Sequence, residues 1–261
     1  MPVRNTVRLA EWYWRICRAP YGVLCAVFAV QQMGILMIQA SRKANVGCGY
    51  TELYLNSLQR FAFLAALVIA AVLACRALWQ SDGKSKAGYT LLTLPMPRGT
   101  LLAGNILLCA VLIVGVAALQ VVLFVVGYFP VRALSGAVCA RLTGGTPEPA
   151  AFYVELAINP VMQALLPAGT RSALDLLLAL TAVSVSVPCV FVHRRTKRVG
   201  AGILAALACA AAGGEMQLTS NYGLCAGYIS STGWGLPVCA TALSAANLIW
   251  ALNALRRSEL A

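Results

Sequence analysis

Charged side chains are scarce in this chain. Only 11% of its 261 residues are Asp, Glu, Lys or Arg, whereas globular proteins carry about 25%. Apolar residues make up 60% of the sequence, so a water-soluble fold would lack the polar side chains needed to cover its surface. Disorder is excluded as well, because disordered chains have low hydrophobicity. The composition therefore predicts a helical membrane protein.

Residues and motifs for catalysis are also missing. The single histidine, His193, stands among arginines, which favours a solvated helix flank over a metal site or a catalytic triad. The sequence has no Gly-x-x-x-x-Gly-Lys-Ser/Thr motif for binding phosphate, no Gly-x-Ser-x-Gly motif and no two-histidine metalloprotease motif. We therefore predict that the chain is not an enzyme and binds neither a metal nor ATP by itself.

Six apolar windows predict membrane spans. A bilayer core about 30 Å thick requires roughly 20 apolar residues in helical form. The fifth window, Val199–Leu218, is rich in Ala and Gly and contains Glu215 near one end. It is included because small residues let membrane helices pack closely. We expect one all-α transmembrane domain over residues 1–261 and no cleaved signal peptide, with spans at Tyr21–Ala40, Phe61–Trp79, Leu101–Val126, Ser172–Val192, Val199–Leu218 and Leu236–Leu255.

The basic residues predict the topology. With both termini in the cytoplasm, the inner segments are 1–19, 76–100, 193–198 and 256–261, and they hold 14 of the 20 Lys and Arg residues. Positive charge concentrates on the cytoplasmic side of membrane proteins, so this arrangement is favoured, and it explains the net charge of +12 without nucleic acid. The inner basic residues are Arg4, Arg8, Arg15, Arg18, Arg76, Lys84, Lys86, Arg98, Arg194, Arg195, Lys197, Arg198, Arg256 and Arg257; the outer ones are Arg42, Lys43, Arg60, Arg132, Arg141 and Arg171.

One long outer loop, residues 127–171, is expected between spans three and four. Val131–Leu142 places apolar residues on one helical face and predicts an interfacial helix. Ala151–Ala168 predicts a surface-lying or re-entrant helix, because Glu155 and Pro160 interrupt it. A seventh span there would also turn the basic segment 193–198 to the outside.

A few polar residues and thiols in or near the spans are candidates for special roles. Asp175 and Glu215 lie near outer ends of spans, and Arg171 precedes Asp175 by four residues, which favours an ordinary helical ion pair. Gln31 and Gln32 are expected to be buried amides that join helices. Three cysteines lie in outer segments, and either two of them form a disulfide or all three are free thiols: Cys48, Cys139 and Cys225.

The inner loop 81–99 differs from the other loops. It begins with polar and basic residues, continues into an apolar stretch, and reaches Pro95 and Pro97, which cannot continue a helix. We predict a short, stiff helix at the cytoplasmic interface, joined directly to spans two and three. The alternative is a segment that only anchors the loop to the bilayer.

The string Tyr89-Thr90-Leu91-Leu92-Thr93-Leu94-Pro95-Met96-Pro97-Arg98 resembles the motif that follows the second span in ABC-2-type transporter permeases. In that family it forms the coupling helix, which docks on a separate ATPase. The segment Leu9–Arg18 is similar to the family's amphipathic helix before span one, with Arg8, Trp12 and Arg15 on one face. The chain departs from the family in placing its long outer insertion between spans three and four instead of spans five and six.

The resemblance implies a permease subunit of an ATP-driven exporter in a bacterial plasma membrane. Its partners would be an ABC ATPase that holds ATP and Mg, a second permease copy or paralogue, and membrane lipid, with a peptide, drug or lipid-like cargo. The alternative is a membrane-embedded binding or immunity protein that sequesters a ligand through Val131–Ala168 without transport. The implied ATPase-docking residues are Tyr89, Leu91, Leu92, Leu94, Pro95, Met96 and Arg98.

Overall fold

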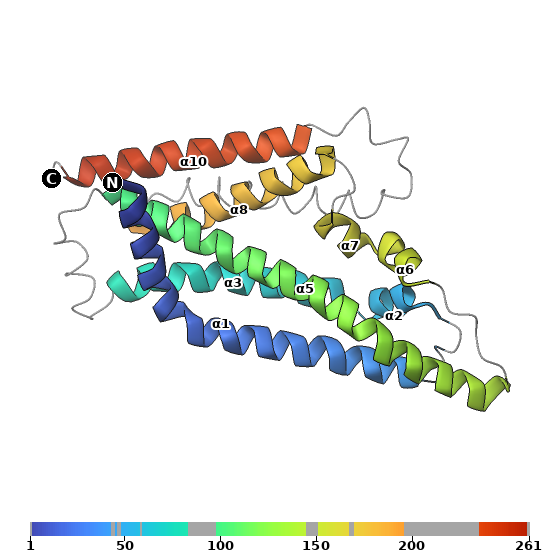
Figure 1. Ribbon diagram of the computed structural model, residues 1–261. Coiled ribbons are helices and arrows are strands. Elements are labelled where there is room, and N and C mark those ends of the chain that lie inside the picture. Colours follow the sequence, from blue (N-terminus) through green and yellow to red (C-terminus); the bar gives the residue numbers. More distant parts are fainter. Residues whose placement is uncertain are drawn as a thin grey trace.

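The computed structural model describes residues 2–42, 45, 48–57, 59–82, 98–144, 151–166, 170–195 and 235–259. The described part is all-helical, with no strand (Figure 1). Its helices are α1 (Pro2–Ser41), α2 (Tyr50–Asn56), α3 (Gln59–Asp82), α5 (Arg98–Thr143), α6 (Phe152–Ile158), α7 (Pro160–Leu165), α8 (Thr170–Arg195) and α10 (Gly235–Glu259).

Five of the six predicted spans each lie within one helix: α1, α3, α5, α8 and α10. Of these, α1, α3 and α5 are long and apolar enough to cross a membrane, and the chain is thus compatible with a membrane protein. Shorter apolar stretches occur in α8 and α10, at Leu176–Cys189 and Cys239–Asn253. The predicted span Val199–Leu218 lies outside the described residues.

The long helices place their ends in two groups at opposite ends of the bundle (Figure 1). The first group holds the N-terminus, the ends of α3, α8 and α10, and the start of α5; the second holds the end of α1 and the starts of α3, α8 and α10. Arg18, Arg76 and Arg98 thus belong to the terminal end of the bundle, whereas Arg42, Arg60 and Arg141 belong to the other. The side of the membrane on which each end lies stays a prediction from the basic residues.

The predicted amphipathic helix before span one is not separate from that span. It is the first part of α1, which continues through Pro20 and bends (Figure 1), as proline inside a helix commonly causes. Leu9, Tyr13 and Cys17 form its buried face. The Cys17 thiol donates a hydrogen bond to the Leu73 carbonyl of α3 at 3.2 Å, so this part of α1 is fixed to the bundle.

The predicted interfacial helix Val131–Leu142 is also part of a longer helix. α5 continues through Pro130 to Thr143 without a break, because Val131 and Cys139 stay buried on the same side of the helix as the residues before them. The helix ends at Gly144, whose φ of 70° is the left-handed conformation that commonly terminates helices.

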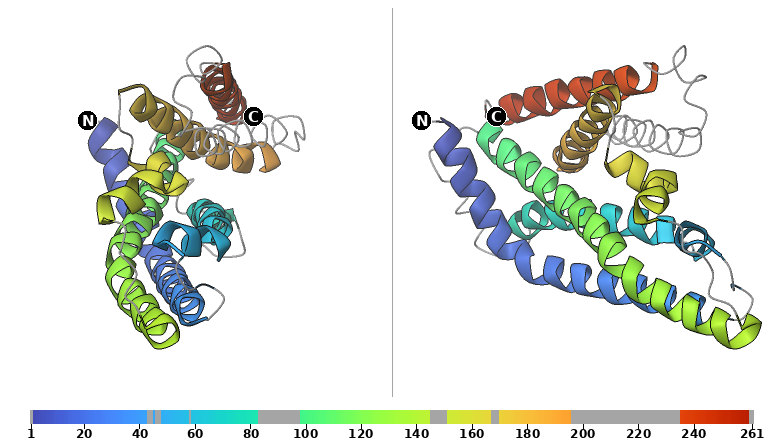
Figure 2. Two further views of the ribbon diagram at one scale, coloured as in Figure 1. Left: turned by 90° about the vertical axis from the view of Figure 1, so that its right-hand side faces the viewer. Right: turned by 45° about the vertical axis from the view of Figure 1, so that its right-hand side comes forward.

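The segment predicted to be surface-lying or re-entrant, Ala151–Ala168, folds into two short helices, α6 and α7. Asn159 separates them, and its side chain accepts hydrogen bonds from the backbone of Val161 and Met162 at the start of α7, the usual role of an N-cap asparagine. Neither helix is long enough to cross a bilayer. They lie beside α2 at the end of the bundle opposite the termini (Figures 1 and 2).

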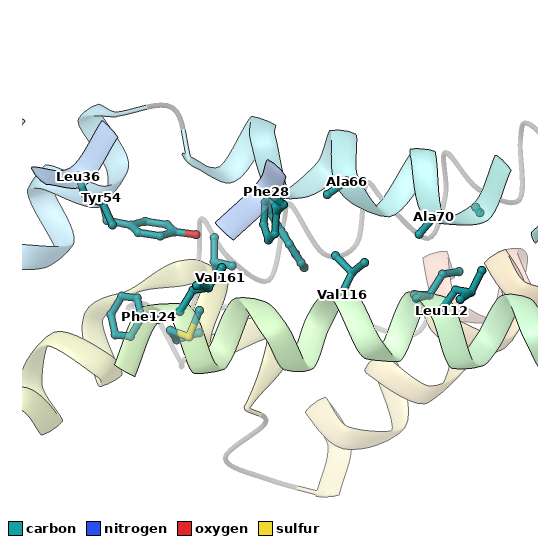
Figure 3. Packing of buried hydrophobic residues seen from close by; sticks show 14 of the residues in the cluster. Phe28, Leu36, Tyr54, Ala66, Ala70, Leu112, Val116, Phe124 and Val161 are labelled. Carbon is teal, nitrogen blue, oxygen red and sulfur yellow. The ribbon is translucent and has the colours of Figure 1, made fainter. Parts of the chain in front are cut away.

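The core is centred on α5, which packs against α1, α3 and α8. Figure 3 shows Ala66 and Ala70 of α3 opposite Val116 and Leu112 of α5, where small side chains on one helix accommodate branched ones on the other. α10 packs mainly against α8, and Ser186 and Ser244 lie within hydrogen-bond distance, 3.2 Å, across that contact. The faces turned away from the core are apolar as well.

The arrangement of α1 predicts which engineered cysteines a membrane-impermeant reagent reaches. Ser41→Cys and Asn5→Cys place exposed thiols at opposite ends of α1. In intact cells, a charged maleimide should label S41C above the level of the native cysteines and leave N5C unlabelled until the cells are broken. Equal labelling of both positions in intact cells would contradict a membrane-crossing α1.

Candidate functional site

Three glutamines and a tyrosine form a hydrogen-bonded group inside the bundle, here called the amide cluster: Gln32, Tyr54, Gln59 and Gln120. The Gln32 amide nitrogen donates to the Gln120 side-chain oxygen at 2.8 Å, and the Gln120 nitrogen donates to the Tyr54 hydroxyl at 2.7 Å. The Gln59 nitrogen donates to the Gln32 backbone carbonyl at 3.3 Å. The four side chains are fully buried. The cluster therefore joins α1, α2, α3 and α5.

The amide cluster retains one unused hydrogen-bond acceptor. Gln59 Oε1 is buried and has no hydrogen-bond partner, although a buried polar atom without a partner costs about 1–3 kcal/mol. Burial raises the pKa of the Tyr54 hydroxyl above its ordinary value, so the phenol stays neutral. A neutral cluster of this kind recognises hydrogen-bond donors or holds helices together; it offers no nucleophile and no general base.

A second polar contact, here called the Glu155 clamp, lies between α2 and α6. The Glu155 carboxylate accepts hydrogen bonds from the backbone N–H groups of Tyr50 at 3.0 Å and Thr51 at 2.8 Å. The Thr51 hydroxyl in turn donates to the Glu155 backbone carbonyl at 2.9 Å. Glu155 is only 6% exposed. A carboxylate at the start of a helix satisfies free N–H groups and interacts favourably with the helix dipole, so Glu155 acts as the N-cap of α2 from a distant part of the chain.

Glycine is needed beside the Glu155 clamp. Gly49 directly precedes α2, and a Cβ atom added there would lie 2.9 Å from Glu155 Oε1. That oxygen is held by the Tyr50 N–H, so it cannot withdraw without losing the capping bond. A side chain at position 49 would therefore require the Glu155 carboxylate to shift from the position in which it caps α2.

α2 connects the clamp to the amide cluster. Tyr50 belongs to its first turn, and the Tyr50 hydroxyl donates to the Phe124 carbonyl of α5 at 3.1 Å. Burial, and to a smaller degree Tyr54 and Glu155, raises the pKa of Tyr50, which keeps this donor protonated. The Tyr50 ring packs edge-on against Phe124 at 4.8 Å. The short helix thus ties α5 to α6.

The residues predicted to dock an ATPase fall mostly outside the described part of the chain. This applies to Tyr89, Leu91, Leu92, Leu94, Pro95 and Met96, whereas Arg98 is the first residue of α5. On α1, Arg8 and Arg15 are exposed, whereas Trp12 is half-buried and its ring packs edge-on against Tyr13 at 5.4 Å. Arg15 pairs with Glu11 at 2.8 Å, an exposed contact of small energetic weight.

The other sequence predictions have mixed outcomes. Gln32 is confirmed as a buried amide that joins helices, but the prediction for Gln31 is wrong, because its side chain is exposed on the opposite face of α1. Cys48 and Cys139 are free thiols, and Cys225 lies outside the described residues, as do Glu215 and the side chains of Arg171 and Asp175. Within the described ranges, no three His, Cys, Asp or Glu residues lie close enough to hold a metal ion.

Sequence reasoning missed Gln59, Gln120 and the capping role of Glu155. Gln120 had a detectable signal, since it is an amide inside a long apolar run and such residues in membrane helices usually face a partner. Glu155 carried no local signal for its role. Its partners, Tyr50 and Thr51, precede it by more than 100 residues.

The amide cluster predicts a coupled loss of stability. Gln32→Leu and Gln120→Leu should each destabilise the protein, because each leaves a buried amide without its partner. The double variant should be less destabilised than the sum of the two, by about 0.6–1.7 kcal/mol, as measured by unfolding in mixed micelles. Gln32→Leu combined with Asn105→Leu is the control and should be additive, because Asn105 bonds the Ala74 carbonyl instead. Additive energies in both cycles would contradict the cluster.

The Glu155 clamp predicts that Gly49→Ala destabilises the chain by about 1–3 kcal/mol, since the new methyl group displaces the capping carboxylate. Gly136→Ala is the control for an added methyl group in open space; because Gly136 lies inside α5, this variant should be up to about 1 kcal/mol more stable than the wild type. Thermal unfolding of both variants and of the wild type in detergent measures the differences. A G49A protein as stable as the wild type would show that the carboxylate is not confined as described.

No known protein family, curated protein or solved structure matches this chain. The described part of the chain provides an all-helical bundle, a buried neutral amide cluster and a set of short helices at the end opposite the termini.

Proposed function

We propose that this chain is the permease subunit of an ATP-binding-cassette exporter and spans the plasma membrane six times, with both termini in the cytoplasm. The observation that carries the proposal is the position of the string Leu94-Pro95-Met96-Pro97-Arg98, which ends where α5 begins and follows the end of α3 at Asp82. A cytoplasmic partner bound there would act directly on two helices of the core.

The packing of α3 and α5 supports the transmission of such a force. The two helices contact each other along the core, where Asn105 of α5 donates a hydrogen bond to the Ala74 carbonyl of α3 at 2.9 Å. Towards the other end, Gln59 of α3 and Gln120 of α5 are both members of the amide cluster. A tilt of the pair at the terminal end of the bundle would therefore move α2, and through the Glu155 clamp also α6.

The energy would come from the partner subunits. Two ATPase subunits would hold ATP and Mg, and their closure would push on the coupling segment 81–99 of each permease. Tyr89, Leu91, Leu92, Leu94, Pro95 and Met96 would seat in the ATPase groove, and Arg98 would contact lipid phosphate or an acidic rim. The neutral interior suits a cargo recognised by hydrogen bonds and apolar contact, such as a peptide, drug or lipid-like molecule.

A second candidate function is a binding or immunity protein that acts without an ATPase. It is favoured by the exposed apolar residues of α6, namely Tyr153, Val154 and Ile158, on a helix that the Glu155 clamp fixes in place. Such a surface would hold a peptide or lipid at the outer face of the membrane. A requirement for an ATPase partner distinguishes the two functions.

The docking role predicts that the double variant Leu92→Asp/Leu94→Asp no longer copurifies with its ATPase, because two carboxylates in an apolar groove lack compensating partners. The measurement is pull-down from detergent-solubilised membranes of cells that co-express this chain and an ABC ATPase. Leu142→Asp is the matched control, since Leu142 is exposed at the opposite end of the bundle, and it should copurify as the wild type does.

Two results would speak against the proposal. If the Leu92→Asp/Leu94→Asp variant retained the ATPase at the wild-type level, the segment would be only a bilayer anchor. If the wild-type chain protected cells from a toxic peptide in the absence of any ATPase, the binding or immunity function would be preferred.

A further inference from the structure

One face of α1 is left open by the bundle. α1 lies along its edge (Figures 1 and 2) and contacts the core through every fourth residue, at Phe28, Gln32, Leu36 and Ala40. The opposite face carries Val27 and Ile38, which are 60% and 56% exposed. Between them lies Gly34, where an added Cβ atom would meet nothing within 4 Å.

Gln31 stands in the middle of this open face. It is exposed, lies near the centre of the span Tyr21–Ala40, and makes no hydrogen bond within the described part of the chain. The mid-span positions of α3 and α5 that are exposed, such as Val68 and Val111, are apolar. On α8, the exposed Thr181 hydroxyl donates to the Leu178 carbonyl of its own helix.

A carboxamide at this depth requires a partner. The hydrocarbon core offers no water to bond the amide, and a glutamine side chain is too short to reach the interface from mid-span. Membrane helices satisfy such groups by hydrogen bonds to another helix. The position of Gln31 therefore indicates a helix–helix contact that the described part of the chain does not provide.

The spacing of the open face defines the kind of contact. Val27, Gln31, Gly34, Ile38 and Ser41 are separated alternately by four and three residues, which is the repeat of a two-helix coiled-coil seam. A single polar residue at one seam position commonly fixes the register and the number of helices. Gly34 allows the backbones to approach closely next to that residue.

We propose that α1 pairs in parallel with α1 of a second copy of this chain, and that the two Gln31 side chains hydrogen-bond to each other across the pair. Copies inserted in one membrane share an orientation, so their α1 helices are parallel and residues of the same number lie at the same depth. A carboxamide both donates and accepts, so its complement at that depth is an identical carboxamide. If the chain is the proposed exporter subunit, this pairing forms the permease dimer. The pairing itself requires only that the chain spans the membrane, and it does not require an ATPase.

Cysteine cross-linking tests the surface in membranes that contain the full chain without any ATPase. Val27→Cys, Gly34→Cys and Ile38→Cys, made singly and oxidised with copper phenanthroline, should each give a disulfide-linked dimer above the level of the native cysteines. Val68→Cys on α3 and Val111→Cys on α5 are matched controls of similar exposure, at 64% and 53%, and should stay at that level. Equal cross-linking at all five positions, or none on α1, would overturn the proposal.

Substitution of Gln31 tests the amide pair. Gln31→Leu should weaken dimerisation about threefold to tenfold, as measured by energy transfer between labelled copies at increasing dilution in vesicles, and Gln31→Asn should retain most of it. Because Gln31 lies outside the monomer core, the unfolding midpoint of the monomer should not change, and Thr181→Val is the control for loss of an exposed polar group. A Q31L dimer as tight as the wild type, or a cross-link to a different protein in place of a second copy, would refute the pairing.

Discussion

Hydrogen bonds that cannot be replaced by water organise this protein. The Gln32 amide donates a hydrogen bond to the Gln120 amide in a fully buried position, and Gln120 in turn donates to Tyr54 of a short helix. Apolar packing alone tolerates sliding and rotation of helices, because one aliphatic contact resembles another. A buried amide pair tolerates neither, since misalignment leaves both groups without partners. The register of α1 against α5 is therefore set by this pair.

The sequence was sufficient to predict the helical class, the position of five long helices and the separation of basic residues between two ends of the bundle. These features depend on the composition of short stretches of sequence, and they do not require knowledge of how the helices pack. The hydrogen-bonded site was not predictable in the same way. Gln32 was recognised as a bridging residue, but its partner on α5 was not identified, because the pairing depends on how α1 and α5 rotate about their axes when they pack.

The two errors about helix boundaries have one physical cause. The segments Leu9–Arg18 and Val131–Leu142 were expected to be separate from the spans beside them, yet α1 continues through Pro20 and α5 through Pro130. A proline removes one hydrogen bond within a helix, but packed neighbours on both sides of it keep the helix continuous. Burial of Tyr13 and Cys17 before Pro20, and of Val131 after Pro130, supplies those neighbours.

The Glu155 clamp has a consequence for the order in which the chain folds during synthesis. The N–H groups at the start of α2 belong to Tyr50 and Thr51, but the carboxylate that caps them is made about 100 residues later. At ribosomal rates of roughly 5–20 residues per second, about 5–20 s pass between the synthesis of α2 and that of its cap. During that interval the whole of α5 is synthesised. The cap of α2 therefore forms only after α1, α3 and α5 have all been synthesised.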